Sequence, residues 1–260
     1  MSFRKLLVPL AGVDSDSAAI DTALVLGHEF EAHIVALHAR PLLENSHLGL
    51  VRELFWSRCK SYGIGELNNK ATDRMSARFL ELQGMEADLI AEHGCLSDLI
   101  IFAHPHSTDL PTWPNISVQS ALRESARPVL LTPNTVTQVG KRNIIAWNGS
   151  LEAVRAVTFA LPILARGANT LVVTVGKHDI QPSGERVVDY LKCHGIEAES
   201  RIVPLERESE SSTLLSASRT FEADLIILGA YTRHRTGRPV FGSMTIEMIK
   251  QNEIPIFMAR

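Results

Sequence analysis

A glycine-punctuated, basic segment near the end of the chain combines the groups that bind phosphate. It follows an apolar run at 225–228, which is typical of a strand buried on both faces. Gly229 ends the run, and Gly242-Ser243 opens a helical pattern, whose first amides and dipole favour an anion. The loop between them contains four basic side chains: Arg233, His234, Arg235 and Arg238. The sequence therefore predicts a phosphate or nucleotide site here.

The spacing of small residues in this segment resembles the closing motif of universal stress proteins, strand, G-x2-G-x9-G-[ST], helix. Gly229, Thr232 and Gly242-Ser243 reproduce it, with threonine replacing the second glycine. If that position needs a positive φ, threonine costs on the order of 1 kcal/mol, which weakens binding without abolishing it. Where the family has an aspartate after the first strand of this half, the chain has Asn148. The resemblance implies a tandem universal stress protein with a degenerate N-terminal domain.

The same resemblance implies an adenine nucleotide, ATP or AMP, with or without Mg²⁺, bound in the C-terminal domain only. It would lie at the carboxyl ends of the parallel strands, where such sheets bind ligands. The residues expected around it are Asn148, Gly149, Val173, Val175, Leu228, Gly229, Thr232, Arg233, Arg235, Gly242, Ser243, Met244 and Thr245. Two other interpretations stay open. Asn148-Gly149 is also typical of a tight turn after a strand, and the arginines are also typical of a solvated surface loop.

The first half lacks this motif. Aligning SDLIIF at 97–102 with ADLIIL at 223–228 places Ala103 opposite Gly229 and Ile116 opposite Gly242. Only Ser117 keeps a motif residue type, and the loop before it has little basic character. We therefore expect no nucleotide in the first half.

An internal repeat indicates the elements that position these residues. RKLLV at 4–8 matches RNIIA at 142–146, and ARPVLLTP matches EIPIFMAR near the end of each copy. Strand and helix signals alternate, which is typical of a parallel sheet covered on both faces. The predicted fold is α/β, with two tandem Rossmann-like domains, 1–137 and 138–260. Each is a mostly parallel five-stranded sheet, and the resemblance implies the fold of adenine nucleotide α-hydrolases.

The two copies differ in regularity. The second shows five strand signals, near 144, 171, 202, 225 and 256, with helices between them. In the first, a predicted helix over 72–83 runs almost directly into another over 85–95, and a long connection at 41–70 carries extra length. The sequence leaves open whether the first copy keeps its third strand.

Composition narrows the class of protein. A net charge of -3 and 45% hydrophobic residues fit a globular protein with no overall attraction to nucleic acid. No apolar stretch is long enough for a membrane span, so we expect a cytoplasmic protein. His104 and His106 lack a second spaced ligand pair, so no metal site is predicted. No catalytic motif is present, and catalysis is not supported.

The sequence leads to a cytoplasmic stress-response protein that binds an adenine nucleotide as a regulatory ligand, with protein partners unknown. The resemblance implies an intramolecular pseudo-dimer through the last strands, PVLLT and PIFMA, with a homodimer as a further possibility. The alternatives are a nucleotide-free protein-interaction scaffold and, third, a slow ATP hydrolase.

Overall fold

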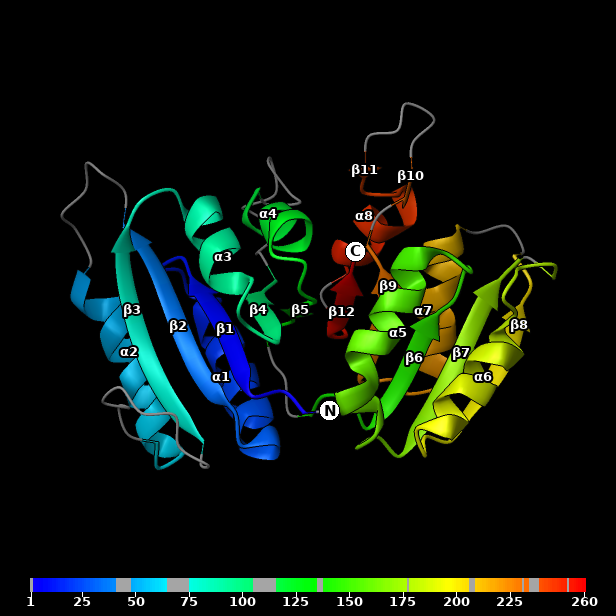
Figure 1. Ribbon diagram of the computed structural model, residues 1–260, viewed down its shortest axis with the longest axis horizontal. Helices are drawn as coiled ribbons and strands as arrows, with labels where there is room; N and C mark the ends of the chain where they lie inside the picture. Colours follow the sequence, from blue (N-terminus) through cyan, green and yellow to red (C-terminus); the bar gives the residue numbers. More distant parts are fainter. Residues whose placement is uncertain are drawn as a thin grey trace. The chain divides into compact units, whose positions relative to one another are not determined.

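The computed structural model describes residues 2–40, 48–64, 75–104, 116–134, 138–176, 178–205, 209–230, 232–233, 239–251 and 253–260. Contacts along the chain divide it into two compact units, Ser2–Thr137 and Gln138–Arg260, here called the N-unit and the C-unit. Each contains a sheet of five parallel strands. Helices flank each sheet, as Figure 1 shows. The predicted α/β fold class is confirmed.

The N-unit sheet has the strand order β3-β2-β1-β4-β5. All of its paired strands are parallel. Its elements, in chain order, are β1 (Lys5–Leu10), α1 (Asp16–Phe30), β2 (His33–Arg40), α2 (Leu48–Ser61), β3 (Ser76–Gln83), α3 (Glu86–Gly94), β4 (Leu99–Ala103), α4 (Ile116–Glu124) and β5 (Val129–Thr132).

The C-unit sheet has the strand order β12-β9-β6-β7-β8, the same topology built from the second copy of the repeat. A separate two-stranded ladder joins β10 and β11. The elements are β6 (Arg142–Ala146), α5 (Leu151–Leu164), β7 (Asn169–Val175), α6 (Gly184–Cys193), β8 (Ala198–Val203), α7 (Glu210–Thr220), β9 (Leu225–Gly229), β10 (Thr232–Arg233), β11 (Pro239–Val240), α8 (Ser243–Ile249) and β12 (Ile256–Ala259).

Helices cover both faces of each sheet. In Figure 1, α3 and α4 lie in front of the N-unit sheet and α1 and α2 behind it, while α5 and α6 lie in front of the C-unit sheet and α7 and α8 behind it. The central strands are therefore apolar along their length: Leu6, Leu7 and Val8 of β1 are fully buried, as are Ile226 and Ile227 of β9. No helix in the described ranges is long and apolar enough to cross a membrane.

The N-unit keeps its third strand, so the predicted helix over 72–83 is wrong. Residues 76–83 form β3, which pairs with all eight residues of β2. Ala77 and Phe79 are buried with the exposed Arg78 between them, a period of two typical of a strand. The residue types of SARFLELQ also suit a helix, and the ladder with β2 overrides that propensity. The helix predicted over 85–95 is present as α3.

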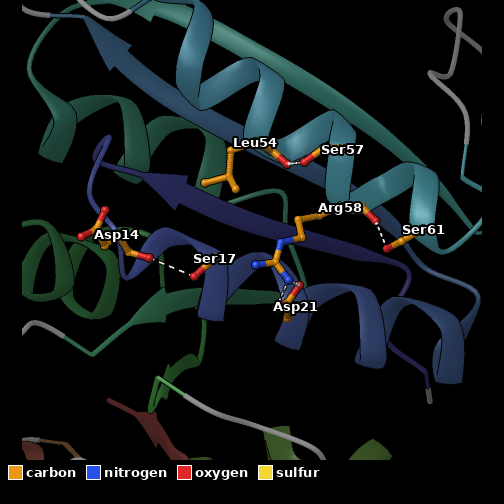
Figure 2. A network of polar contacts seen from close by, with 7 residues as sticks. All are labelled: Asp14, Ser17, Asp21, Leu54, Ser57, Arg58 and Ser61. Carbon is orange, nitrogen blue, oxygen red and sulfur yellow. Dashed lines mark hydrogen bonds and ion pairs between the residues drawn. The ribbon is translucent and has the colours of Figure 1, made fainter.

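The stretch at 41–70, predicted as a long connection, contains the helix α2. An ion pair attaches α2 to α1: Nη1 of Arg58 lies 2.9 Å from Oδ2 and 3.3 Å from Oδ1 of Asp21. Figure 2 shows Arg58 reaching from α2 to Asp21. It also shows the hydroxyls of Ser57 and Ser61, which donate to the backbone carbonyls of Leu54 and Arg58 within α2. Burial raises the pKa of Asp21, and Arg58 opposes this shift. The pair links the two helices at a partly exposed position, while the buried face of α2 carries Val51, Phe55 and Cys59.

One structural feature is the same in both units. The carboxylate of Asp98, before β4, accepts the N–H groups of Arg4 and Lys5 at 2.7 and 2.9 Å. Asp224, before β9, accepts the N–H groups of residues 140, 141 and 142 at 2.9–3.1 Å and the side-chain amide of Gln138 at 2.7 Å. Each aspartate satisfies backbone donors where its first strand begins. It thereby joins two central strands at the edge opposite their carboxyl ends.

Candidate functional site

A pocket of about 180 Å³ lies where β6, β7 and β9 of the C-unit end. Its residues come from those strand ends, the turn after β6, the segment before α6, and the helices α7 and α8. They are Ala146, Trp147, Asn148, Val173, Val175, Ile180, Glu210, Leu214, Leu228, Gly229 and Met244. The lining is mostly apolar, with one amide and one carboxylate. Such a site can hold a flat apolar ring with polar groups on its edge.

The turn after β6 is built by local hydrogen bonds. The side-chain oxygen of Asn148 accepts the N–H of Ser150 at 3.1 Å, and the Ser150 hydroxyl accepts the N–H of Ala153 at 3.1 Å, capping α5. Gly149 has a φ of 72°, and a Cβ there would lie 2.8 Å from the carbonyl oxygen of Gln181. Asn148-Gly149 thus serves as a tight turn, while the exposed Asn148 still borders the pocket.

Gly229 is required by close packing of a strand on a helix. A Cβ at this position would lie 2.7 Å from the backbone nitrogen of Ala153 and 2.8 Å from the carbonyl carbon of Glu152. The end of β9 therefore lies directly against the first turn of α5. The glycine of the motif lets the strand end and the helix start meet at one wall of the pocket.

The segment before α6 closes another side of the pocket. The indole nitrogen of Trp147 donates to the carbonyl of Pro182 at 2.7 Å, and the Trp147 side chain is 4% exposed. The main-chain N–H of Trp147 also donates to the carbonyl of Val173 at 2.8 Å. These bonds hold Trp147 between two strands and the segment that carries Ile180, so the wall is fixed by polar contacts as well as packing.

The basic segment is only partly described. Thr232 and Arg233 form β10, which pairs antiparallel with β11 through Thr232↔Val240 and Arg233↔Pro239. Arg235 lies outside the described residues, as does Arg238. The described non-glycine residues with positive φ are Glu31, Ala126 and Glu222, so the threonine in place of glycine carries no such strain.

The start of α8 lies next to this ladder. Gly242 precedes it in an extended conformation with a φ of -65°, so no positive φ requires the glycine. Ser243 is exposed, Thr245 is 4% exposed, and Met244 lines the pocket. Of the motif residues in α8, only Met244 reaches the pocket, because the three side chains point in different directions around one helical turn.

A hydroxyl–carboxylate contact joins α7 to α8. The buried Ser211 donates a short hydrogen bond to Oε2 of Glu247. Hydrogen bonds from Ser211 and then Ser209 lower the pKa of Glu247. The carboxylate also lies near the positive end of the α7 dipole, which favours its charged form. Glu247 is therefore engaged in holding two helices together and is not poised as a general base.

The same edge of the N-unit is built from charged and polar groups. The carboxylate of Asp16, which is 4% exposed, accepts the N–H groups of Ala11, Gly12 and Val13 at 2.8–3.3 Å. The repeat aligns Val8 with Ala146, so the strand registers place His38 where the C-unit has Val175. Its Nδ1 lies 2.9 Å from the carbonyl oxygen of Leu10, which fixes Nδ1 as the donor.

A second acid lies near Asp16. Burial, then the charge of Asp16, raises the pKa of Glu86, against a hydrogen bond from Ser117 and the charge of His38. Burial likewise raises the pKa of Asp16, against its three backbone hydrogen bonds and His38. The N–H groups of the first loop of the N-unit thus form a backbone nest that already has an acceptor, the carboxylate of Asp16.

The pocket gathers six of the thirteen residues predicted for the nucleotide: Asn148, Val173, Val175, Leu228, Gly229 and Met244. It also includes residues that sequence reasoning missed, among them Trp147, Ile180, Glu210 and Leu214. Trp147 could have been found, because it directly follows the first strand signal of this half. Ile180 lies before α6, and Glu210 and Leu214 lie on α7, so no spacing rule connects them to the motif.

The described residues show no cluster of three or more His, Cys, Asp or Glu side chains arranged to hold a metal ion. His104 is buried at the end of β4, and His106 lies outside the described residues. The three cysteines are free thiols; Cys59 is buried, which raises its pKa to about 12, while Cys95 and Cys193 are exposed.

No protein-family model matches the chain, and no curated protein matches it by sequence. Solved structures do match. A universal stress protein from Archaeoglobus fulgidus aligns over 98% of both chains, with 16% identity and a TM-score of 0.72. A functionally unknown protein from Pseudomonas aeruginosa PAO1 aligns over 99% of this chain and 92% of its own, with 14% identity and a TM-score of 0.66. A Pseudomonas aeruginosa UCBPP-PA14 protein, provisionally assigned as a universal stress protein, aligns over 99% of this chain and 93% of its own, with 15% identity and a TM-score of 0.65.

These matches extend over both units, so the expected likeness to tandem universal stress proteins is confirmed at the level of the fold. At these identities they say nothing of what the pocket holds.

Proposed function

We infer that this chain, which has the fold of universal stress proteins, acts as a cytoplasmic stress-response protein and binds an adenine nucleotide as a regulatory ligand in the C-unit only. One observation carries the proposal. Residues predicted from the strand ends and from the motif come together around one pocket at the carboxyl ends of β6, β7 and β9. Ligands of open parallel α/β sheets bind at this edge.

The size of the pocket favours a base over a whole nucleotide. Its volume of about 180 Å³ is below the range of about 300–1,000 Å³ typical of sites that enclose an entire small ligand. It suits a planar bicyclic base packed against Val173, Leu228 and Met244. The sugar and phosphates would then lie outside it, toward α8 and the basic segment.

Glu210 gives the proposed ligand an orientation. A carboxylate repels phosphate and accepts a hydrogen bond from an amino group, so the base end of the nucleotide belongs beside Glu210. The exocyclic amino group of adenine is such a donor, whereas the corresponding oxygen of hypoxanthine is not. The proposal therefore includes a preference for AMP over IMP.

Calorimetry with adenosine, AMP, IMP and ATP tests the proposal on the full chain. We expect one site per chain. Met244→Trp should fill the pocket and lower AMP affinity at least about tenfold, a loss of about 1.4 kcal/mol. The matched control is Ile246→Trp, which is on the same helix and does not line the pocket. Equal effects of the two variants, or two equivalent sites per chain, would contradict the site.

A second arm separates the base from the phosphates. Neutralising Arg233, Arg235 and Arg238 together should weaken ATP far more than adenosine, and the binding of ATP to the parent protein should weaken as salt rises. Absence of binding at millimolar ATP, with no nucleotide in mass spectra of the native protein, would favour the nucleotide-free interaction scaffold. Turnover of ATP above background would favour the slow hydrolase.

A further inference from the structure

The strand β8 is an exposed edge of the C-unit sheet. It pairs with β7 on one side, and no described strand pairs with it on the other. None of its six residues is buried. Hollows flank it on both faces: one of about 1060 Å³ includes Arg201 and Val203, and one of about 340 Å³ includes Ser200 and Ile202. An edge of this kind presents unpaired backbone groups to another chain.

The backbone of β8 has a defined direction. The N–H of Gly176 donates to the carbonyl of Val203 at 2.8 Å, so Val203 directs its backbone groups toward β7. Along a strand this direction alternates, and Glu199 and Arg201 therefore also bond to β7. The N–H and C=O groups of Ala198, Ser200 and Ile202 consequently point outward, away from the sheet.

We propose that β8 pairs antiparallel with β8 of a second copy of this chain, about a two-fold axis at Ser200. In this register the outward-pointing residues meet one another: Ser200 lies opposite Ser200, and Ala198 opposite Ile202. Backbone hydrogen bonds then form at all three positions. The register follows from the direction of the backbone groups and needs no change within the C-unit.

The same register pairs opposite charges. Glu199 lies opposite Arg201 of the second copy, and Arg201 opposite its Glu199, because the two residues are equally far from the axis. They occupy a non-hydrogen-bonded pair, in which facing side chains approach most closely. The sequence of β8 is therefore complementary to itself, as an interface with two-fold symmetry requires.

Within one chain the two charges already pair weakly. Nη2 of Arg201 lies 2.8 Å from Oε2 of Glu199, but the two side chains are 58% and 71% exposed. Such a pair contributes little alone. In the dimer, four charges alternate in sign across two strands. Ile202, 46% exposed in one chain, would become covered by Ala198 of the second copy.

The edge strand of the N-unit does not have this property. The charges of β3 in the middle of the strand are Arg78 and Glu81, an odd number of residues apart. Their side chains therefore point to opposite faces, and no antiparallel register of β3 with itself opposes them. Of the two edge strands, β8 alone has a sequence that is complementary to itself. The strand β8 also lacks proline and lysine, which commonly protect sheet edges.

Charge reversal tests the proposal by sedimentation or light scattering of the full chain across a concentration series. Glu199→Arg and Arg201→Glu should each raise the dimer dissociation constant at least about tenfold, because each places like charges opposite one another. Mixing the two variants should restore association, since every facing pair is then opposite in sign. The double variant E199R/R201E should dimerise like the parent. Circular dichroism should be unchanged throughout.

Cysteine cross-linking tests the register itself. In a chain with Cys95 and Cys193 replaced by serine, oxidation of a mixture of Glu199→Cys and Arg201→Cys proteins should yield more disulfide-linked dimer than either protein alone. A monomeric parent, a dimer unaffected by both charge reversals, or a mixture that links no better than its components would each overturn the proposal.

Discussion

The carboxyl ends of the two sheets carry opposite kinds of side chain at matching positions. Where the C-unit has Val175 beside an apolar pocket, the N-unit has His38 bonded to a backbone carbonyl. In the C-unit the side chain of Asn148 bonds the turn after β6, and Ser150 caps α5. In the N-unit the corresponding loop donates its backbone N–H groups to the carboxylate of Asp16. One fold thus supports an open pocket in one copy and a self-occupied nest in the other, through a few side chains at the strand ends.

The helix contacts behind these sites also differ. In the C-unit a hydroxyl of α7 donates to a carboxylate of α8, through Ser211 and Glu247. In the N-unit the carboxylate belongs to α3 and the hydroxyl to α4, through Glu86 and Ser117. The reversal brings Glu86 near Asp16, whereas Glu247 has two serine donors. Placing the carboxylate on the first of the two helices instead of the second therefore puts two acidic side chains, Glu86 and Asp16, near one another in the N-unit only.

The largest effect is expected from Asp16→Ala, which removes the carboxylate from the N-unit nest. Three backbone N–H groups would lose their acceptor in a part-buried site, at a cost of about 3 kcal/mol. Hydrogen exchange of the N-unit amides during urea unfolding measures it. The control is Asp14→Ala, an exposed side chain two residues earlier. If Asp16→Ala costs no more than the control, the nest is not self-occupied and the comparison fails.

A smaller effect, about 2 kcal/mol, is expected from Gly229→Ala in the C-unit, because its Cβ would overlap the backbone of α5 and force a shift. The matching change in the N-unit is Ala103→Gly, which should cost under about 1 kcal/mol through chain entropy alone. Thermal unfolding of both variants decides the question. Equal costs would mean that the strand and helix approach one another alike in the two units.

The aspartates at the opposite edge of each sheet, Asp98 and Asp224, allow the two units to be compared through the number of hydrogen bonds that each accepts. Asp224→Ala removes the acceptor of four donors and Asp98→Ala that of two. Both should destabilise their own unit, and Asp224→Ala should cost about 1 kcal/mol more. Hydrogen exchange resolved by unit is the measurement. A loss confined to the other unit would contradict the division of the chain at these contacts.

The smallest effect concerns pH. The pKa values of Asp16 and Glu86 are raised on folding, so the folded N-unit binds protons more tightly than the unfolded chain. The resulting stability is present at low pH and is lost as pH rises through the raised values. Glu86→Gln should therefore stabilise the N-unit at pH 7 by less than about 1 kcal/mol, and should flatten the pH dependence of its stability above about pH 4. A parent N-unit that gains stability over this range would contradict the expectation.

The order of strands and helices in the C-unit follows from its sequence, because β6, β7, β9 and β12 each contain an apolar run and helical patterns lie between the strands. The N-unit could not be predicted so fully. In SARFLELQ, residues such as Ala77 and Leu80 suit a helix as well as a strand, and only the ladder to β2 decides. Gly63, with a φ of 68°, follows the end of α2, where the N–H of Ile64 bonds back to the carbonyl of Cys59. The sequence shows this glycine but not the Arg58–Asp21 pair, whose members are far apart in sequence.

The site divides in the same way. Val173, Leu228 and Gly229 could be predicted because the family resemblance implies a ligand at the carboxyl ends of the parallel strands, and the apolar runs of β7 and β9 are visible in the sequence. Glu210 and Leu214 could not, because they enter the pocket from a crossover whose path depends on packing. The nest around Asp16 was missed for a related reason: its hydrogen bonds are to the backbone, and their acceptor resembles an ordinary helix-start aspartate in sequence.

The two aspartates at the opposite edge also bear on how the units fold. Asp98 bonds residues 93 and 94 positions earlier in the chain, and Asp224 bonds residues 82 to 86 positions earlier. Such contacts close long loops and therefore form only after most of a unit has been organised. Removing either carboxylate should accordingly speed unfolding and leave the folding rate nearly unchanged. The contacts of these aspartates would then form after the folding transition state, and would lengthen the lifetime of each folded unit without changing how fast it folds.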